Sequence, residues 1–531
     1  MKSISSTKLI IAVSVFLILF YNFSFFSNVT EIYPVSVKNS GFLLSLAFFS
    51  GSITIILFSL ACNRYTIKPA LIAVLALSAA TGYFMDAYNV VINEDMIDNI
   101  VRTDLGEAMD LLSFRYVLYM LLLGIIPSII IYKIKIDFHR PAKELFSRLK
   151  LIAASLAIVA TAIFLFSNFY ASFFREHKLL RYYMNPTAYI FSTGKYVSRA
   201  FASPPGELAH IAQDAVIQED GDHRELVILV IGETARADRF SLNGYERETN
   251  PLLKKKNAIS FTNVWSCGTS TAYSVPCIFS GDDHGNFDKT IAGHTENVLD
   301  VLRNLGANVL WLDNNSDSKG VALRIPYESY KTPEKNPVCD IECRDVGMLA
   351  NLQTYIDSHP KGDIFIVLHQ MGNHGPAYYK RYPEEFEAFK PTCKTNELED
   401  CTIDEINNAY DNAILYTDYF LAKTIDLLDH NKYAFEASMI YVSDHGESLG
   451  ENGIYLHGLP YIFAPEAQIH VPMIIWLGDS YTNDVINLDG LKQRTGEHLT
   501  HDNIFHTILG MLEVRTVAYN TTMDLIKHHA H

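Results

Sequence analysis

The chain has 531 residues, which is too long for one ordinary domain of about 100–200 residues. Its formal net charge of −16 argues against nucleic acid as a partner. Apolar residues make up 49% of the chain, but the first 170 residues hold nearly all of the long apolar runs.

Five of these runs are candidate membrane spans, because a helix needs about 20 mostly apolar residues to cross a bilayer. They are residues 9–26, 42–62, 70–84, 117–132 and 151–170. The third and fourth runs reach the required length only with their flanking residues. No small-residue cleavage site follows the first run, so we interpret it as a retained anchor and not as a cleaved signal peptide.

Charges in the connecting loops predict the topology of these spans. Lys and Arg precede the first run, follow the second and concentrate between the fourth and the fifth. Residues 27–41 and 85–113 contain few of them, and the second of these loops is acidic. The positive-inside rule then places the N-terminus in the cytoplasm and the large C-terminal part outside. We expect a five-span domain over 1–172, an interfacial segment and linker over 173–223, and an outer domain over 224–531.

Cysteine usage is consistent with this topology. Six of the seven cysteines lie in the part placed outside the membrane, and an even number in an oxidising compartment indicates disulfides. Sequence proximity favours three pairs without establishing them: Cys267–Cys277, Cys339–Cys343 and Cys393–Cys401. Free or metal-binding thiols are the alternative, and it is disfavoured because no CxxC pair with zinc spacing is present.

From Glu225 onward, short runs of branched apolar residues end in polar or Gly-rich residues. The runs read "LVILVIGET", "ANVLWLDNN", "DIFIVLHQMGNHGP" and "ASMIYVSDHGES", and helical stretches such as 295–305 and 404–428 lie between them. This pattern is typical of buried parallel strands with helical crossovers, so we predict an α/β sandwich after the helical membrane domain. Ligands bind such sheets beyond the carboxyl ends of the strands. Those ends carry Glu233, Asp313, His369, His374, Asp444 and His445.

Residue types at these strand ends predict a metal site. Asp444 and His445 are adjacent in "SDHGE", and Glu233 adds a carboxylate from another strand end. A histidine with carboxylates suits Zn²⁺ or Mn²⁺. His374 and His457 lie in Gly-flanked loops, where a ligand can approach the backbone. Each residue alone has an ordinary explanation, such as a helix N-cap or a surface side chain, but the set of five is harder to explain in that way.

The stretch "CGTSTAYSVPC" places five hydroxyl side chains between two cysteines. Coordination to a metal lowers the pKa of a hydroxyl and makes it a nucleophile, and a disulfide around the loop would restrain its position. The residues themselves do not single out one hydroxyl among Thr269, Ser270, Thr271, Tyr273 and Ser274. A polar surface loop closed by a disulfide is the alternative interpretation.

Eight motifs in this order resemble the lipid A phosphoethanolamine transferases, including the mobile colistin-resistance type, in the alkaline-phosphatase-like superfamily. They are "GETARAD", "CGTSTAYSVPC", "DNNSDSKG", "ECRDVGML", "HQMGNHGPAY", "AYDN", "YVSDHGESLGENG" and "YLHG". The resemblance, which covers nearly the whole chain, implies a monomeric zinc enzyme of the bacterial inner membrane with a periplasmic catalytic domain. It implies transfer of phosphoethanolamine from phosphatidylethanolamine to a lipid A phosphate through a phosphothreonine-type intermediate, and hence polymyxin and colistin resistance.

The resemblance also carries roles to matching residues. Thr271 matches the nucleophile, and one tight zinc site matches Glu233, Thr271, Asp444 and His445. Residues around the phosphate and the phosphoethanolamine group match Lys319, His374 and His457, and a second, weaker zinc site is a candidate near the two histidines. Headgroup-binding positions match Asn99, Thr103 and Glu107, whose i, i+4, i+8 spacing predicts one face of a helix. The loop between Cys339 and Cys343 is shorter than the resemblance leads us to expect.

Three other functions are considered. A sulfatase-like hydrolase of the same superfamily needs a C/S-x-P-x-R context, and here Ile278 stands where the arginine belongs. A phosphoglycerol transferase also combines five spans with this domain type, but the long match to the lipid A family disfavours it. A membrane sensor with an inactive site is disfavoured because the matched residues at 233, 271, 444 and 445 are all intact.

Overall fold

The computed structural model describes residues 3–103, 105–202, 206–217, 224–479 and 488–526, so part of the predicted linker lies outside the described residues. The chain divides into two compact units. The first comprises Met1–Ile97 and Leu112–Ala200, and the second comprises Asp98–Leu111 and Phe201–His531. The short segment Asp98–Leu111 therefore belongs to the second unit, although the chain returns to the first unit after it. The predicted domain boundaries stay predictions.

The first unit is a helical bundle that contains the predicted spans. Among the described residues, four helical stretches are long and apolar enough to cross a membrane: α3 (Val37–Ala61), α4 (Ile67–Tyr88), the stretch Phe114–Lys133 formed by α7, η1 and α8, and α9 (Pro141–Leu165). A fifth span requires that α1 (Ser6–Phe20) and α2 (Phe23–Ile32) count together, and this pair is bent by 57°. Five spans were predicted, and the structure confirms a domain of four such helical stretches, or five when the bent pair counts as one.

The bend between α1 and α2 has a side-chain cause. Asn22 lies at the break and is buried. Its amide nitrogen donates to the carbonyl oxygens of Leu17 at 3.0 Å and of Asn185 at 2.8 Å, and its amide oxygen accepts from the Asn185 backbone. These bonds compete with the helical ladder, which is a recognised origin of kinks. The bundle continues through α10 (Ser167–Glu176), η2 (Lys178–Tyr183) and α11 (Thr187–Ala202).

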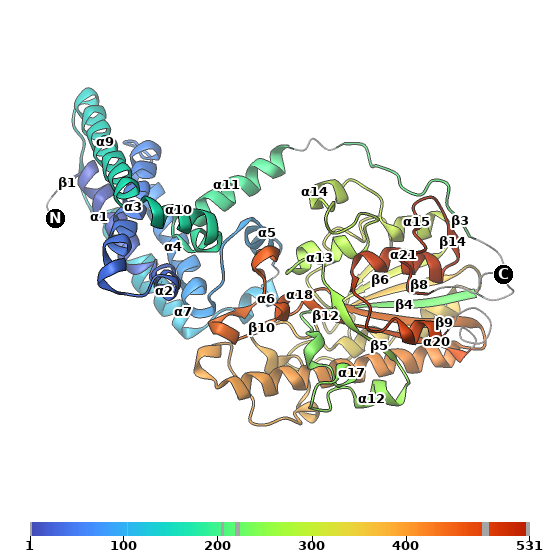
Figure 1. The fold of residues 1–531 in the computed structure, drawn as a ribbon. Helices are drawn as coiled ribbons and strands as arrows, with labels where there is room; N and C mark the ends of the chain where they lie inside the picture. Colours follow the sequence, from blue (N-terminus) through green and yellow to red (C-terminus); the bar gives the residue numbers. More distant parts are fainter. Residues whose placement is uncertain (1–2, 104, 203–205, 218–223, 480–487, 527–531) are drawn as a thin grey trace. The chain divides into compact units, whose positions relative to one another are not determined.

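An eight-stranded sheet forms the centre of the second unit, with strand order β13-β5-β12-β9-β4-β8-β6-β7 (Figure 1). The strands are β4 (Arg224–Gly232), β5 (Ile259–Trp265), β6 (Asn308–Asp313), β7 (Tyr327–Ser329), β8 (Ile364–His369), β9 (Phe435–Ser443), β12 (His470–Leu477) and β13 (Leu499–Thr500). The four apolar runs predicted as parallel strands are β4, β6, β8 and β9, and they are parallel. Strand β12 is antiparallel to both β9 and β5, which the sequence did not predict.

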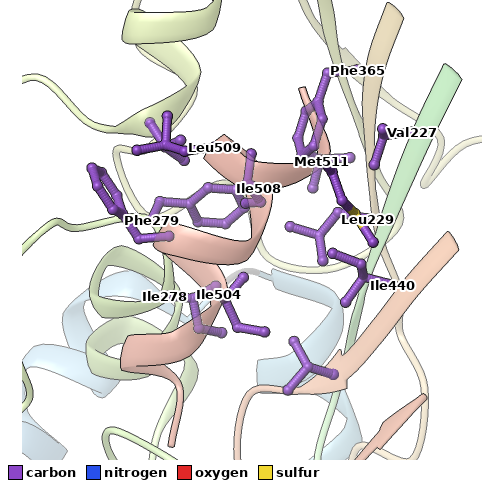
Figure 2. Close-up of a cluster of buried hydrophobic side chains, with 14 of the residues drawn as sticks. Val227, Leu229, Ile278, Phe279, Phe365, Ile440, Ile504, Ile508, Leu509 and Met511 are labelled. Carbon is purple, nitrogen blue, oxygen red and sulfur yellow. The ribbon is translucent and has the colours of Figure 1, made fainter. Parts of the chain in front are cut away.

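Helices cover both faces of this sheet. On one face runs α17 (Ile403–Asn431), whose first turn is closed by a capping box between Thr402 and Glu405. On the other face lie α13 (Thr271–Ile278), α15 (Val298–Asn304) and α21 (Asp502–Met511). Figure 2 shows Ile508 and Met511 of α21 packed against Leu229 of β4 and Ile440 of β9. This burial fixes the helices against the sheet and positions the start of α13.

Three disulfides lie in the second unit. The structure pairs Cys267 with Cys277, Cys339 with Cys343 and Cys393 with Cys401. These are the pairs that sequence proximity favours, including the short Cys339–Cys343 loop. Cys62 in the first unit is a buried free thiol.

Candidate metal centre

Strand register brings three of the predicted ligands together. Gly232 of β4 is paired with Ser443 of β9, so the next residues of the two parallel strands, Glu233 and Asp444, are neighbours. The Asp444 backbone N–H donates to the Gly232 carbonyl at 3.0 Å, which fixes this junction. Glu233, Asp444 and His445 are fully buried, and each offers one ligand atom within 4.8 Å of the others.

The electrostatics of this cluster favour a cation. Burial, and then the Asp444 charge, raises the pKa of Glu233 well above its usual range, and burial raises the pKa of Asp444 to about 6. Glu233 Oε1 and Asp444 Oδ2 are buried and have no hydrogen-bond partner among the described residues. Two buried, under-satisfied carboxylates are costly, and a bound metal ion would relieve that cost.

His445 has the tautomer that a metal ligand needs. Its Nδ1 lies 2.9 Å from the Gly446 carbonyl oxygen, which can only accept, so Nδ1 carries the proton. Its Nε2 is left as an acceptor and lies 3.5 Å from Glu233 Oε1 and 3.3 Å from Asp444 Oδ2. Burial lowers the pKa of the imidazole, which keeps that lone pair available. A backbone carbonyl orienting a ligating histidine is a common arrangement around metals.

One hydroxyl from the Cys267–Cys277 loop lies at this cluster. Thr271 opens α13, and its Oγ1 donates to Glu233 Oε2 at 3.1 Å and lies 3.4 Å from His445 Nε2. Thr269 donates instead to the Leu459 carbonyl at 2.7 Å, and the Tyr273 hydroxyl lies 3.4 Å from the Phe287 carbonyl. The structure therefore separates Thr271 from these competing hydroxyls by its position.

Further groups hold the ligands in place. The Asn315 amide nitrogen donates to Glu233 Oε2 at 2.8 Å and to the Gln370 carbonyl at 2.6 Å. The backbone N–H groups of Thr234 and His445 donate to Asp444 Oδ1 at 3.2 and 2.7 Å. Asn315 had no predicted role, although it lies in the "DNNSDSKG" motif. A polar residue two positions after a buried strand was the only available signal.

Two histidines that the sequence could not distinguish have different environments. His457 lies beside His445, with ring centroids 4.3 Å apart, and 5.8 Å from the ring of His374. Burial lowers the pKa of His457, but the Glu447 carboxylate at 3.1 Å from its Nδ1 outweighs burial and raises it overall. Burial, and then the charge of Arg381, lowers the pKa of His374 to about 3. His374 is therefore neutral, and His457 is the more readily protonated of the two.

Lys319 is placed near the same strand ends. It is buried, has φ of +50° and donates from Nζ to the Ser316 carbonyl at 2.8 Å and to the Ser316 hydroxyl at 2.5 Å. Within the described part of the chain, no carboxylate forms an ion pair with Lys319. A buried ammonium held only by neutral oxygens favours an anion nearby.

The three predicted headgroup residues do not share one helix, and this expectation was wrong. Helix α5 (Glu94–Arg102) ends before Thr103, and α6 (Leu105–Asp110) carries Glu107. Thr103 turns its hydroxyl back to the Asn99 carbonyl at 2.8 Å. Asn99, Thr103 and Glu107 nevertheless belong to the second unit, and the Glu107 charge is close enough to raise the pKa of Glu233 and of His457.

Comparisons with known proteins identify the family of this chain. The family described as phosphoethanolamine transferase EptA/EptB matches residues 51–201, and the sulfatase family matches residues 225–514. Phosphatidylethanolamine transferase Mcr-1 from Escherichia coli is 45% identical over 526 residues, which are 97% of this chain and 96% of Mcr-1. The chain belongs to the phosphoethanolamine transferase family.

Other phosphoethanolamine transferases agree with this assignment. EptA from Escherichia coli strain K12 is 38% identical, and the match covers 95% of this chain and 94% of that protein. The solved integral membrane protein lipooligosaccharide phosphoethanolamine transferase A from Neisseria meningitidis has a TM-score of 0.95 and 34% identity, with 99% of each chain covered. The fold of this member of the phosphoethanolamine transferase family is therefore that of an integral membrane protein with a sulfatase-like second unit.

Proposed function

We propose that this chain transfers phosphoethanolamine from phosphatidylethanolamine to a lipid A phosphate through a covalent intermediate on Thr271. The observation that carries the proposal is the position of the Thr271 hydroxyl, 3.1 Å from Glu233 Oε2 at the start of α13. Relatives named phosphatidylethanolamine transferase Mcr-1 and Kdo(2)-lipid A phosphoethanolamine 7''-transferase support the donor and the acceptor.

A zinc ion fits the residues that the structure brings together. Glu233, Asp444, His445 and Thr271 would hold it, since two buried carboxylate oxygens lack partners and an imidazole lone pair faces them. When bound, zinc would lower the pKa of the threonine hydroxyl and neutralise charge on the phosphoryl oxygens. We place this site in the periplasm, with the spans in the bacterial inner membrane and the N-terminus in the cytoplasm.

Two displacements account for the transfer. In the first, Thr271 Oγ1 passes its proton to Glu233 Oε2, which accepts it at 3.1 Å, and attacks the phosphorus of phosphatidylethanolamine. The bond from phosphorus to the glycerol oxygen breaks. The departing diacylglycerol oxygen needs a proton, and His457 is the candidate donor because Glu447 favours its protonated form. In the second, an oxygen of the lipid A phosphate monoanion attacks the same phosphorus, and the bond to Thr271 Oγ1 breaks. Thr271 takes its proton back from Glu233, and the acceptor phosphate returns a proton to His457.

Neutral and cationic groups have separate roles in this scheme. His374, held neutral by burial, is suited to orient the phosphoryl group through a hydrogen bond. The buried Lys319 ammonium adds a fixed positive charge for the developing negative charge. Each transferred ethanolamine places a cation on lipid A, so cationic polymyxins should bind the modified outer membrane less tightly.

The deciding experiment measures the mass of lipid A from cells that express the wild type, Thr271→Ala or Tyr273→Phe. Tyr273→Phe is the matched control, because it removes a hydroxyl from the same disulfide-closed loop. We expect a phosphoethanolamine gain in the wild type and the control, and a loss of about 10³-fold or more in Thr271→Ala. Transfer by Thr271→Ala would refute the covalent mechanism. A mass gain of phosphoglycerol would refute phosphoethanolamine as the transferred group, and no mass gain in any strain would refute lipid A as the acceptor.

A further inference from the structure

The segment Asp98–Leu111 is attached to the second unit by ion pairs near both of its ends. Asp98 pairs with Lys289, the first residue of helix α14 (Lys289–Ala292). At the other end, Asp110 binds Lys380 at 2.6 Å and Arg381 at 2.5 Å. The Asn396 side-chain amide also donates to the Asp110 carbonyl at 2.7 Å. The segment is therefore held at two separated points.

Arg381 is the centre of the second attachment. Its side chain is only 2% exposed, and its forked guanidinium reaches three different parts of the unit. Nη2 binds Asp110, Nη1 binds Glu342, and Nε donates to the His374 carbonyl at 2.7 Å. Arginine can satisfy three directions in this way because its donors are arranged in a rigid planar fork.

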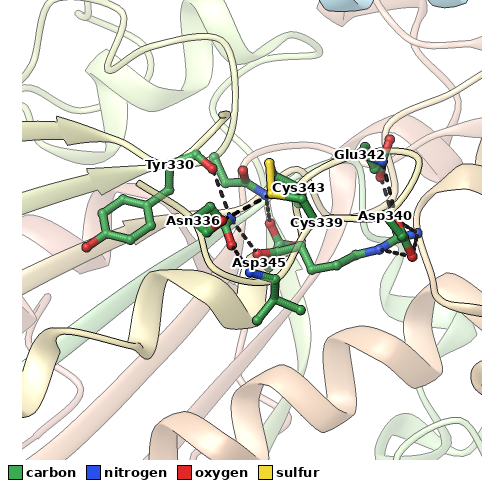
Figure 3. The surroundings of a disulfide bond; sticks show 10 residues. Tyr330, Asn336, Cys339, Asp340, Glu342, Cys343 and Asp345 are labelled. Carbon is green, nitrogen blue, oxygen red and sulfur yellow. Dashed lines mark hydrogen bonds and ion pairs between the residues drawn. A yellow bond between two sulfur atoms is a disulfide. The ribbon is translucent and has the colours of Figure 1, made fainter. Parts of the chain in front are cut away.

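Glu342 comes from the short loop closed by Cys339 and Cys343 (Figure 3). In that loop Asp340 binds Arg344 at 2.6 Å, and Glu342 lies 3.4 Å from the same guanidinium. Arg344 also donates to the Lys380 carbonyl at 2.5 Å, so it supports the backbone that presents Arg381. The disulfide-closed loop thus provides one of the contacts that hold the Arg381 side chain in place.

Besides Glu342, Arg381 contacts the His374 carbonyl and the Asp110 carboxylate, and both belong to elements that lead to the candidate metal centre. Through the His374 carbonyl, Arg381 fixes the loop that carries the His374 imidazole. Through Asp110, it fixes the end of α6, one turn after Glu107. The ring of His374 lies 5.8 Å from the ring of His457, which lies 4.3 Å from that of His445, so the loop that Arg381 holds reaches the candidate metal centre.

We infer that Arg381 and Asp110 are positioning residues for donor binding, because together they set the Glu107 segment and the His374 loop around one substrate site. This inference rests on the proposed function and adds two residues to it. Neither side chain needs to touch the reacting phosphorus. Their effect is to hold groups that contact the headgroup, so loss of the contact raises KM for phosphatidylethanolamine more than it lowers kcat.

Asp110→Asn tests this with the full-length chain in nanodiscs that contain phosphatidylethanolamine. The change keeps the side chain's size and removes the charge that binds Arg381 and Lys380. We expect KM for the donor to rise about tenfold while kcat stays within about twofold. Asp110→Glu should restore KM to within about threefold of the wild type, because it returns the carboxylate. Asp426→Asn is the matched control, since it breaks a Lys256–Asp426 pair of the same 2.6 Å length that joins no site residue.

Hydrogen exchange provides a readout that needs no turnover. In Asp110→Asn, amides of 98–111 should exchange about tenfold faster than in the wild type, with peptides of β4 and β9 unchanged. Lys380→Met, at a side chain that is 30% exposed, is a milder second variant that should show the same direction of change. Wild-type KM together with wild-type protection of 98–111 in these variants would overturn the inference. Equal losses of kcat in Asp110→Asn and Asp110→Glu would also overturn it, because that result indicates a general structural role.

The outcomes separate this inference from the proposed function. A wild-type chain that transfers nothing to lipid A refutes the proposed function, while hydrogen exchange still reports whether Asp110 anchors the segment. A wild-type chain that transfers normally, with unchanged KM in Asp110→Asn, refutes the positioning role alone.

Discussion

Replacing Gly372 with alanine tests whether the backbone behind Glu233 sets the affinity of the metal centre. Gly372 has φ of +52°, and a Cβ at this position would lie 2.9 Å from the Glu233 carbonyl oxygen and 3.0 Å from its nitrogen. Both atoms belong to backbone, so neither can rotate away, and Glu233 itself has to move. Changes to the groups that hold a metal ligand in position typically lower metal affinity about 10–100-fold. We expect Gly372→Ala to lower the affinity for zinc by that amount.

Gly306→Ala separates this contact from ordinary backbone strain. Gly306 follows α15 with φ of +93°, and a Cβ there would meet nothing within 4 Å. A left-handed conformation costs alanine roughly 1–2 kcal/mol, so both variants should melt about 2–8 °C lower than the wild type. Only Gly372→Ala should also bind zinc more weakly.

The assay is a competition titration of zinc against a chromophoric chelator, with purified full-length protein and a parallel thermal unfolding curve. Equal zinc affinities for Gly372→Ala and Gly306→Ala, at equal melting temperatures, would refute the reasoning. That result would mean that Glu233 reaches its ligand position without the close backbone contact.

Two further predictions concern stability of the second unit. Burial, and then the Glu436 and Asp363 charges, raises the pKa of Glu225 well above its usual range, so the folded chain holds a proton that the unfolded chain releases. Stability from this proton is present at low pH and is lost as the pH rises through the folded pKa. The melting temperature of Glu225→Gln relative to the wild type should therefore rise by about 2–4 °C from pH 5 to pH 8. A difference in melting temperature that does not depend on pH would contradict the raised pKa. Ile508→Ala empties a fully buried position on α21, and truncations of this kind cost about 2–5 kcal/mol. Its melting temperature should fall by at least about 5 °C, and an unchanged value would show that α21 does not depend on this packing.

The sequence predicts the four contiguous parallel strands of the sheet better than the antiparallel strand beside them. Runs that became β4, β6, β8 and β9 are apolar on both faces, and such runs between helical stretches indicate buried parallel strands. Strand β12 was not predicted, and its "HVPMIIWL" run is interrupted by Pro472. Its antiparallel direction was not readable either, since burial on both faces gives the same pattern in either direction.

At the site, residue types were informative where the strands themselves supply the geometry. Glu233, Asp444 and His445 follow strand ends, and parallel neighbours bring such residues to one edge. Asn315 and Arg381 could not be predicted, because their roles depend on partners 82 and 271 residues away in the chain. The break between α5 and α6 was also hidden, since the i, i+4, i+8 spacing is compatible with one helix or two.

The ion pair between Asp110 and Lys380 can form only late in synthesis. The two residues are 270 positions apart, and a ribosome adds roughly 5–20 residues per second, so Asp110 emerges roughly 15–50 s before its partner exists. During that interval the segment around Glu107 has no folded surface to rest on. A chain arrested before Lys380 would thus contain every predicted span and the Lys289 partner of Asp98, and yet lack the attachment of Asp110. The acidic loop is made early, but it can complete its attachment only after most of the chain has been synthesised.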